Sequence, residues 1–415
     1  MDKIHKDANE MITRTIAENL PHTAVENALK NHEFTGNVYM VAIGKAAWVM
    51  AKAASEFLGN KIKKGIIITK YDHSKGEIPN IEIIEAGHPV SDENTIIGTN
   101  KVVEMAEQLT EKDEVLFLVS GGGSALFESP LEGVTLSDIV DLTKQLLASG
   151  ADIVEMNMIR KRLSKVKAGR FAEICAPAKL FTVVLSDVLG DRLDSIASGP
   201  AAPDMSTVED AMEVVTKYDL KLSETMMEYL KKETPKEVTN VETIITGSVR
   251  TLCDSTANIA KELGYQPLVL SATMNCEAAE AGKMIASMAY EIGQSEYSLK
   301  KPCAIIIGGE TVVHLKGKGL GGRNQEMALV AATVLEGAED VVFFSLGSDG
   351  TDGPTDAAGG IVDGTTVEKM RVKGLNVKAF IANNDSYHAL KAVDGLIITG
   401  PTGTNVNDVS VLLCK

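Results

Sequence analysis

The sequence predicts an α/β protein of two domains, each built on a mostly parallel sheet with helices on both faces. The chain has 415 residues, more than the roughly 250 to 300 at which a single hydrophobic core stops growing. Apolar segments with strand character alternate with helical segments along most of its length. That alternation is typical of three-layer α/β domains.

The first thirty residues have helical periodicity, and the alternation of strand, turn and helix begins after them. In the first half of the chain, we expect strands at 37–43, 65–69, 113–119 and 179–185. Helices are expected directly after the first strand, twice within 137–169, and within 205–240.

The second half repeats the same alternation. We expect strands at 242–246, 266–270, 303–315, 341–346, 378–382 and 409–414, with helices after the first two of these and from Arg323. The stretch KKETPKEVTN, residues 231–240, is the most linker-like. We therefore predict a larger Rossmann-like domain over 1–240 and a smaller α/β domain over 241–415, with the last strand either in the second sheet or returning to the first domain.

Composition narrows the classes of protein to consider. The formal net charge of −16 and an aromatic content of 4% argue against a nucleic-acid partner. The five cysteines have no CxxC spacing, so neither a disulfide framework nor a structural zinc site is indicated. The first twenty residues carry charges throughout, and no apolar run approaches the ~20 residues of a membrane span. We expect a cytoplasmic protein with no membrane association.

Polar residues follow several of the expected strands. Because ligands of open parallel sheets bind beyond the carboxyl ends of the strands, these residues are the candidates for a site. They are Lys45, the SGGGS segment 120–124, Asp187, Asp191, Glu310 and Asp349. Glycine amides, hydroxyls, a cation and carboxylates for Mg²⁺ are the groups that phosphoryl transfer needs.

The SGGGS segment is predicted to hold phosphate groups through Ser120, Gly121, Gly122, Gly123 and Ser124. A tight turn from strand to helix would also explain the three glycines on steric grounds alone. The two flanking hydroxyls favour the anion site.

Two cations stand at the starts of expected helices, where the helix dipole opposes a positive charge. They are Lys45 and Arg323, and the next residue, Asn324, shares the second position. We expect an anionic ligand at both places. The basic run between 160 and 170 is interpreted as a solvated helix face, of which one or two side chains could point into a binding site.

The segment GSDGTDGPTDAAGG, residues 347–360, holds Asp349, Asp352 and Asp356 directly after an expected strand. Carboxylates that repel one another are tolerated where a divalent cation or ligand donors offset the repulsion. The alternative is an acidic turn whose aspartates cap their own backbone.

A second class of function remains open at this point. GKGLGG, residues 317–322, matches the GxGxxG pattern of a dinucleotide-binding oxidoreductase, although one such match is weak evidence in a chain with 36 glycines. There is no GxxxxGK[ST] segment, which excludes a Walker-type kinase. His88 and His388 have no second histidine at ligand spacing, and we interpret both as structural or solvent-facing.

Several segments, taken together and in order, resemble one known family. They are VAIGKAA, EAGHPVSDE, SGGGSAL, NMIRKRLSKVKAGRFA, LSDVLGD, GGETVV, GGRNQEMAL, GSDGTDGPTDAAG and GTNVNDV. The combination resembles the type II glycerate kinases, whose C-terminal part is called the MOFRL domain, from about residue 5 to the C-terminus.

The resemblance implies ATP-dependent phosphorylation of D-glycerate with Mg²⁺, in a cleft between the two α/β domains. The implied catalytic cations fall on Lys45 and Arg323. We expect ATP at Ser120–Ser124 and Asn324, and Mg²⁺ on some of Asp187, Asp191, Glu310 and Asp349. Phosphorylation at the 2-hydroxyl is favoured, with the 3-hydroxyl and a hydroxypyruvate reductase as alternatives. The oligomeric state is expected to be a monomer or a homodimer.

Overall fold

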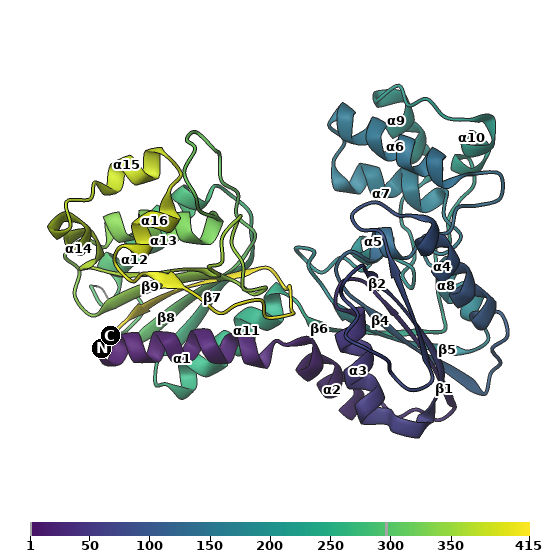
Figure 1. Ribbon diagram of the computed structural model, residues 1–415, viewed down its shortest axis with the longest axis horizontal. Coiled ribbons are helices and arrows are strands. Elements are labelled where there is room, and N and C mark those ends of the chain that lie inside the picture. The colour runs from purple at the N-terminus through teal and green to yellow at the C-terminus, as the bar shows by residue number, and fades with distance from the viewer. Residues whose placement is uncertain (1, 295–297) are drawn as a thin grey trace. The chain divides into compact units, whose positions relative to one another are not determined.

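The structure is a computed structural model that describes residues 2–294 and 298–415, and it forms two compact units (Figure 1). The central unit is Pro21–Thr246, and the terminal unit combines Met1–Leu20 with Gly247–Lys415. Each unit holds one six-stranded sheet. None of the helices in the described part of the chain has the length and apolar character needed to cross a membrane.

The predicted domain boundary at residue 240 is corrected, and the structure decides between the two places that were left open for the last strand. Strand β6 (Val241–Gly247) lies next to β5 (Lys179–Leu185) in the central sheet, so the boundary falls after Thr246. The last strand, β12 (Asp408–Cys414), pairs with two strands of the terminal sheet and does not return to the central unit.

Helix α1 (Lys3–Glu18) was predicted in the first domain but belongs to the terminal unit, together with residues 247–415. Its buried face, which includes Met11, packs in the terminal unit, and helix α1 contacts α11 (Val249–Glu262). The hydroxyl oxygens of Thr15 and Thr256 lie 3.1 Å apart between these helices. A contact 241 residues apart along the chain cannot be inferred from helical periodicity, which explains the wrong assignment.

The central sheet has the strand order β3-β2-β1-β4-β5-β6. Its other strands are β1 (Asn37–Ile43), β2 (Ile62–Lys70), β3 (Ile81–Ala86) and β4 (Asp113–Val119). The pairs β3–β2, β2–β1, β1–β4 and β4–β5 are parallel. The order reverses between β1 and β4, and such a switch point is where doubly wound sheets bind ligands.

Helices cover both faces of the central sheet. Because side chains alternate along a strand, Met40 and Ala42 of β1 pack under α2 (Pro21–Lys30) and α3 (Ala47–Leu58), whereas Val41 and Ile43 face the opposite layer. That opposite layer contains α4 (Glu93–Ala106) and α8 (Arg170–Cys175). Two short 3-10 helices, η1 (Gly59–Lys61) and η2 (Ile196–Ser198), also belong to the central unit.

A group of four helices forms a second core within the central unit, and we call it the helical cap. Its members are α6 (Leu136–Ser149), α7 (Ile153–Arg162), α9 (Val208–Lys217) and α10 (Glu224–Leu230). Figure 1 shows them gathered on the side of the sheet where the short helix α5 (Gly123–Leu126) lies. The cap therefore stands over the carboxyl end of β4.

The terminal sheet has the order β11-β10-β9-β12-β8-β7. Its strands are β7 (Gln266–Met274), β8 (Cys303–Gly309), β9 (Val341–Gly347), β10 (Gly359–Asp363), β11 (Leu396–Ile397) and β12. Four of them run in one direction, and β10 and β12 run the opposite way. The predicted α/β class, with helices that alternate with strands in two domains, is confirmed, and the expected mostly parallel sheet is found in the central unit. In the terminal sheet, four of the five neighbouring strand pairs are antiparallel, because β10 and β12 lie between strands that run the other way.

Most helices of the terminal unit pack on one face of its sheet. They are α12 (Ala278–Glu291), α13 (Arg323–Val334), α14 (Thr366–Val372), α15 (Val377–Ala382) and α16 (Ser386–Lys391). Residues 378–382 were predicted as a strand and form part of α15 instead. Asn376 caps this helix by accepting hydrogen bonds from the amides of Lys378 and Ala379, and α15 has no fully buried residue.

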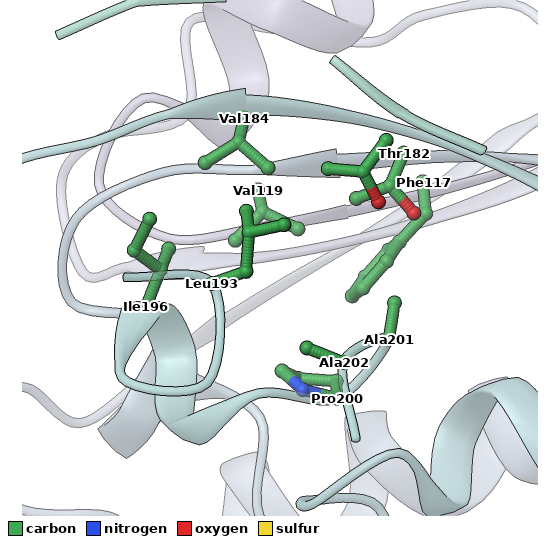
Figure 2. A pocket seen from close by; sticks show the side chains of 10 residues that line it. Phe117, Val119, Thr182, Val184, Leu193, Ile196, Pro200, Ala201 and Ala202 are labelled. Carbon is green, nitrogen blue, oxygen red and sulfur yellow. The ribbon is translucent and has the colours of Figure 1, made fainter. Parts of the chain in front are cut away.

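A small apolar cavity of about 20 Å³ lies between β4, β5 and the segment that follows η2. Figure 2 shows Phe117, Val119 and Val184 on the sheet side and Pro200 and Ala201 on the loop side. A cavity of this size has room for about one water molecule and is far below the ~300 Å³ of a ligand pocket. We assign it to the core and not to a substrate site.

Candidate functional site

The two loops at the β1–β4 switch point are bonded to each other. The backbone amide of Lys45 donates to the carbonyl of Gly121 at 2.9 Å. The hydroxyl of Ser120 donates to the carbonyl of Ile43 at 3.1 Å and accepts from the amide of Ala46 at 3.1 Å. With Ser120 only 3% exposed, its hydroxyl holds the two loops together, and its predicted contact with phosphate stays a prediction.

Each glycine of the SGGGS segment has a close neighbour. A Cβ on Gly121 would lie 2.1 Å from Oδ2 of Asp187, and a Cβ on Gly122 would lie 2.9 Å from ring atoms of His88. A Cβ on Gly123 would lie 2.7 Å from the Cβ of Ala197. At distances under 3 Å, an added Cβ would force its neighbour to move, so the glycines allow other groups to approach the loop closely.

Lys45 and His88 lie beside Gly122. A Cβ there would lie 3.3 Å from Cγ of Lys45, whose side chain is half-buried. His88 lies against the same glycine, and its pKa is lowered by burial and, next, by the charge of Lys45. His73 lies at the same loop, with its Nδ1 3.0 Å from the carbonyl oxygen of Lys45.

His88 is a candidate site residue that the sequence analysis did not single out. It was interpreted as structural or solvent-facing, yet it lies beside Lys45 and Gly122. The signal was available, since His88 comes two residues after Ala86, the last residue of β3. The absence of a second histidine at metal-ligand spacing favoured a structural interpretation of His88.

Ser124 connects the loop to the helical cap. Its hydroxyl oxygen lies 2.9 Å from that of Ser198, which in turn donates to Asn157 of α7 at 3.1 Å. The carbonyl of Ser124 accepts a hydrogen bond from the ammonium of Lys167 at 2.6 Å. Glu128 accepts a second bond from the same ammonium at 2.5 Å.

The interpretation of the basic run 160–170 as a solvated face is wrong. Lys161 is 3% exposed, and Arg162 and Lys167 are 0% exposed. Arg162 donates to the carbonyls of Lys232 and Ser206 at 2.7 and 2.8 Å. The cations bond carbonyl oxygens and carboxylates inside the unit, and a charge count along the sequence cannot distinguish this from hydration.

The predicted metal carboxylates are divided between the units. Asp187 and Asp191 lie in the turn after β5, and Asp187 meets the SGGGS segment at Gly121. Glu310 and Asp349 follow β8 and β9 in the terminal unit. Among residues 2–294 and 298–415, no group of three or more His, Cys, Asp or Glu side chains is arranged to hold a metal ion.

In the terminal unit, Arg323 begins α13 and is held by two carboxylates. Its Nε donates to Oδ2 of Asp408 at 2.5 Å, its Nη2 donates to Oδ1 at 3.0 Å, and Nη1 lies 3.3 Å from Glu310. The sequence analysis did not single out Asp408. These charges raise the pKa of Arg323, although burial opposes the change.

The amino end of α13 already has an anion, the carboxylate of Asp352. Its oxygens accept from the amide of Asn324 at 3.2 Å and from the amide of Gln325 at 2.9 Å. Asn324 is buried, its side-chain nitrogen reaches Asp352, and its oxygen accepts from Ser345. These contacts favour a structural role for Asn324, and its predicted contact with the nucleotide stays a prediction.

The three aspartates of the segment 347–360 have separate partners. Asp349 accepts from the amide of Thr351 at 2.9 Å, whereas Asp356 accepts from the hydroxyl of Tyr387 at 2.8 Å. Asp352 caps α13, as described above. Only Asp349 caps the backbone of its own turn, so the alternative describes one of the three aspartates. A role of Asp349 toward metal stays a prediction.

The GxGxxG segment 317–322 does not have the setting of a dinucleotide fingerprint. Strand β8 ends at Gly309, thirteen residues before α13, and the residues between form a loop. The strand expected at 303–315 ends at Gly309, and Val312 makes only a single bridge, with Glu277. The fingerprint requires the glycine turn directly after a strand.

Comparisons with known proteins cover nearly the whole chain. A family model described as a domain of unknown function (DUF4147) matches residues 7–231, and the model of the MOFRL family matches residues 303–408. The chain is 54% identical to a D-glycerate 2-kinase of Thermotoga maritima over 99% of this chain and 98% of that protein. It is 40% identical to a glycerate 2-kinase of Pyrococcus horikoshii over 99% and 98%. A crystal structure of glycerate kinase from Thermotoga maritima matches with a TM-score of 0.95 at 54% identity, covering 99% of each chain.

Proposed function

The chain belongs to the type II glycerate kinase family, whose C-terminal part is the MOFRL domain, and from this premise we propose that it transfers the γ-phosphoryl group of ATP to D-glycerate to give 2-phosphoglycerate. The observation that carries the proposal is the similarity to a D-glycerate 2-kinase over almost the whole length of both chains. Phosphorylation at the 3-hydroxyl is the alternative for the product.

In the central unit, we assign the phosphate groups of ATP to the SGGGS segment and charge neutralisation to Lys45. The stem of Lys45 lies against Gly122, and its backbone is bonded to Gly121, so the residue is anchored at this loop. Phosphoryl transfer depends on positioning and on cations that meet the charge on the transferred group. Lys45 supplies such a cation.

In the terminal unit, we assign binding of the glycerate carboxylate or of the γ-phosphoryl group to Arg323. Asp408 holds the guanidinium plane through two hydrogen bonds. A guanidinium fixed in this way offers its remaining N–H groups in a defined direction, which suits recognition of planar or tetrahedral oxyanions. An incoming anion would have to displace Glu310, which lies 3.3 Å from Nη1 and is largely exposed.

The proposed reaction also needs Mg²⁺, and the carboxylate of Asp187 fits that ion. Carboxylate oxygen is a preferred ligand of Mg²⁺, which is usually held by one or two protein carboxylates together with substrate phosphates and water. Asp187 lies against Gly121 of the loop assigned to phosphate. Asp187 would hold Mg²⁺ at this loop, and the ion would neutralise the charge of the phosphate groups. Asp191, Glu310 and Asp349 remain further candidates.

A pair of assays separates this function from the reductase alternative. The chain is incubated with D-glycerate, ATP and Mg²⁺, and release of ADP is followed; a second sample receives hydroxypyruvate and NAD(P)H, and oxidation of the nicotinamide is followed. We expect turnover in the first assay alone. Turnover in the second alone would replace the kinase with an oxidoreductase, and binding without turnover in either would indicate a regulatory protein on the same fold.

A further inference from the structure

Arg160, in the last turn of α7, is partly exposed, and its guanidinium differs from the buried cations of the helical cap in its partners. Across residues 2–294 and 298–415, no hydrogen bond or ion pair of the structure reaches its guanidinium, and its Nε is buried without a partner. The other cations of the same run have partners: Lys161 with Asp194, Arg162 with Lys232, Lys167 with Glu128, and Arg170 with Ser164.

The position of Arg160 on α7 directs it toward the SGGGS segment. Asn157 lies three residues earlier, so the two side chains share one face of the helix. Asn157 accepts from Ser198, whose hydroxyl meets that of Ser124. Burial and, to a smaller extent, the charge of Arg160 lower the pKa of Lys167, and Lys167 donates to the carbonyl of Ser124. Arg160 thus belongs to the layer directly behind Ser124.

The charges around Arg160 do not balance. Glu128 is the acid that acts on its charge, and Lys167 already pairs with Glu128 at 2.5 Å. Two cations therefore share one carboxylate, and burial lowers the pKa of Arg160. A buried N–H without a hydrogen-bond partner, such as the Nε of Arg160, is costly, and an anion bound to the guanidinium would remove that cost.

We infer that Arg160 is an anion-binding residue of the central unit, which receives an oxyanion, the carboxylate of glycerate or a phosphate group of ATP, beside Ser124. The inference rests on the proposed function for the identity of the two ligands. Guanidinium is suited to the task because its fork matches carboxylate and phosphate geometry.

One competing explanation lies inside the protein. Oε1 of Glu128 is also buried without a hydrogen-bond partner. A shift of Arg160 toward this oxygen would satisfy both groups without any ligand. Glu128→Gln removes the charge of that partner and therefore belongs in the test.

The test uses three variants of the full chain: Arg160→Gln, Arg160→Lys and Glu128→Gln. Lys165→Met serves as the matched control, because it removes one exposed cation from the same run. Dissociation constants for D-glycerate, ATP and inorganic phosphate are measured separately by calorimetry, with melting temperatures on the same preparations. We expect Arg160→Gln to weaken binding of one of the first two ligands by about tenfold or more, with the control unchanged.

The ligand that is affected identifies the source of the oxyanion. Loss confined to D-glycerate assigns the carboxylate, and loss shared by ATP and inorganic phosphate assigns a phosphate group. Arg160→Lys keeps the charge and tests the same point if the glutamine variant does not fold. The inference is overturned if all three ligands bind both Arg160 variants as they bind the wild type, or if Glu128→Gln reproduces every change. Inorganic phosphate still tests the site if the wild type fails to phosphorylate glycerate.

Discussion

Arg323 and Asp408 form a bidentate pair in the terminal unit, with Nε donating to Oδ2 at 2.5 Å and Nη2 donating to Oδ1 at 3.0 Å. Arg323 is the first residue of α13 and Asp408 the first of β12, so the pair joins elements that are 85 residues apart. The direction of the guanidinium therefore depends on a strand at the end of the chain.

The first prediction concerns the shape of the Arg323 side chain. Arg323→Lys keeps the charge but loses the fork, so we expect it not to restore function and kcat/KM to fall ~10²-fold. If Arg323 mainly holds the substrate carboxylate, the KM for glycerate should rise; if it meets the phosphoryl group in the transition state, kcat should fall instead. A variant with a lower melting temperature and normal kinetics would remove Arg323 from the active site.

A second prediction concerns Asp408 as a positioning residue. Asp408→Asn places an amide donor opposite the guanidinium donors, and the loss of a charge-assisted hydrogen bond of roughly 1.5–3 kcal/mol corresponds to about 10- to 100-fold in rate. We expect kcat/KM to fall by that factor. Wild-type kinetics in this variant would show that Arg323 is oriented without Asp408.

The same carboxyl group predicts a pH dependence. Burial raises the pKa of Asp408 to about 6, against the opposing effect of Arg323. Activity should therefore fall as the pH drops through this value, because a protonated Asp408 has no negative charge to pair with the guanidinium of Arg323. The pH profile of Asp408→Asn should lack this acidic limb. A wild-type profile that stays flat down to about pH 5 would contradict the role of Asp408.

Stability should change in the opposite direction at this residue. Since the pKa of Asp408 in the folded chain lies above the ordinary 3.8, the folded state binds the proton more tightly than the unfolded state. The contribution of Asp408 to the free energy of unfolding therefore increases as the pH falls between these values. The melting temperature of the wild type relative to Asp408→Asn should rise while activity falls, which distinguishes loss of positioning from acid unfolding.

Lys45→Ala tests the cation of the central unit. We expect kcat to fall by ~10²-fold or more with little change in melting temperature, because the bond from the Lys45 amide to Gly121 is kept. Lys52→Ala is a suitable control, since it removes an exposed lysine of the adjacent helix α3. Near-normal kcat in Lys45→Ala would assign this lysine a structural role.

Gly122→Ala tests the close approach of His88 to the loop. Gly122 has a φ of +87°, and an added Cβ would lie 2.9 Å from the His88 ring. Gly150→Ala is the matched control, with a φ of +78° and open space around the added atom. Both should lose about 1 kcal/mol of stability from backbone strain, and only Gly122→Ala should lose activity. Equal activity in the two variants would contradict the placement of the site at this loop.

The fold was largely predictable because its signals are local. The alternation of strands and helices predicted the two sheets. Lys45 and the SGGGS segment were predicted as site residues because they follow the carboxyl ends of β1 and β4. What could not be predicted depends on contacts between distant residues. Helix α1 joins the terminal unit through α11, and residues 378–382 form a helix on the surface of the terminal unit.

The chemistry of the candidate site was predicted less completely for the same reason. The basic run was taken for a solvated face because its partners, such as Glu128 and the carbonyl of Ser206, lie far away in the sequence. Asp408 lies in GTNVNDV, one of the segments that resemble the family, but nothing in that segment indicates that it pairs with Arg323. Charged residues show their type in the sequence, but their burial and their partners appear only in the folded chain.

Phosphorus NMR of the reaction product tests the central claim most directly. The chain is incubated with D-glycerate, ATP and Mg²⁺, and the spectrum is compared with those of authentic 2- and 3-phosphoglycerate. We predict the resonance of 2-phosphoglycerate together with those of ADP, and its loss when Mg²⁺ is removed by a chelator. The resonance of 3-phosphoglycerate would contradict the proposed position of transfer, and a spectrum with no phosphoglycerate would contradict the kinase function itself.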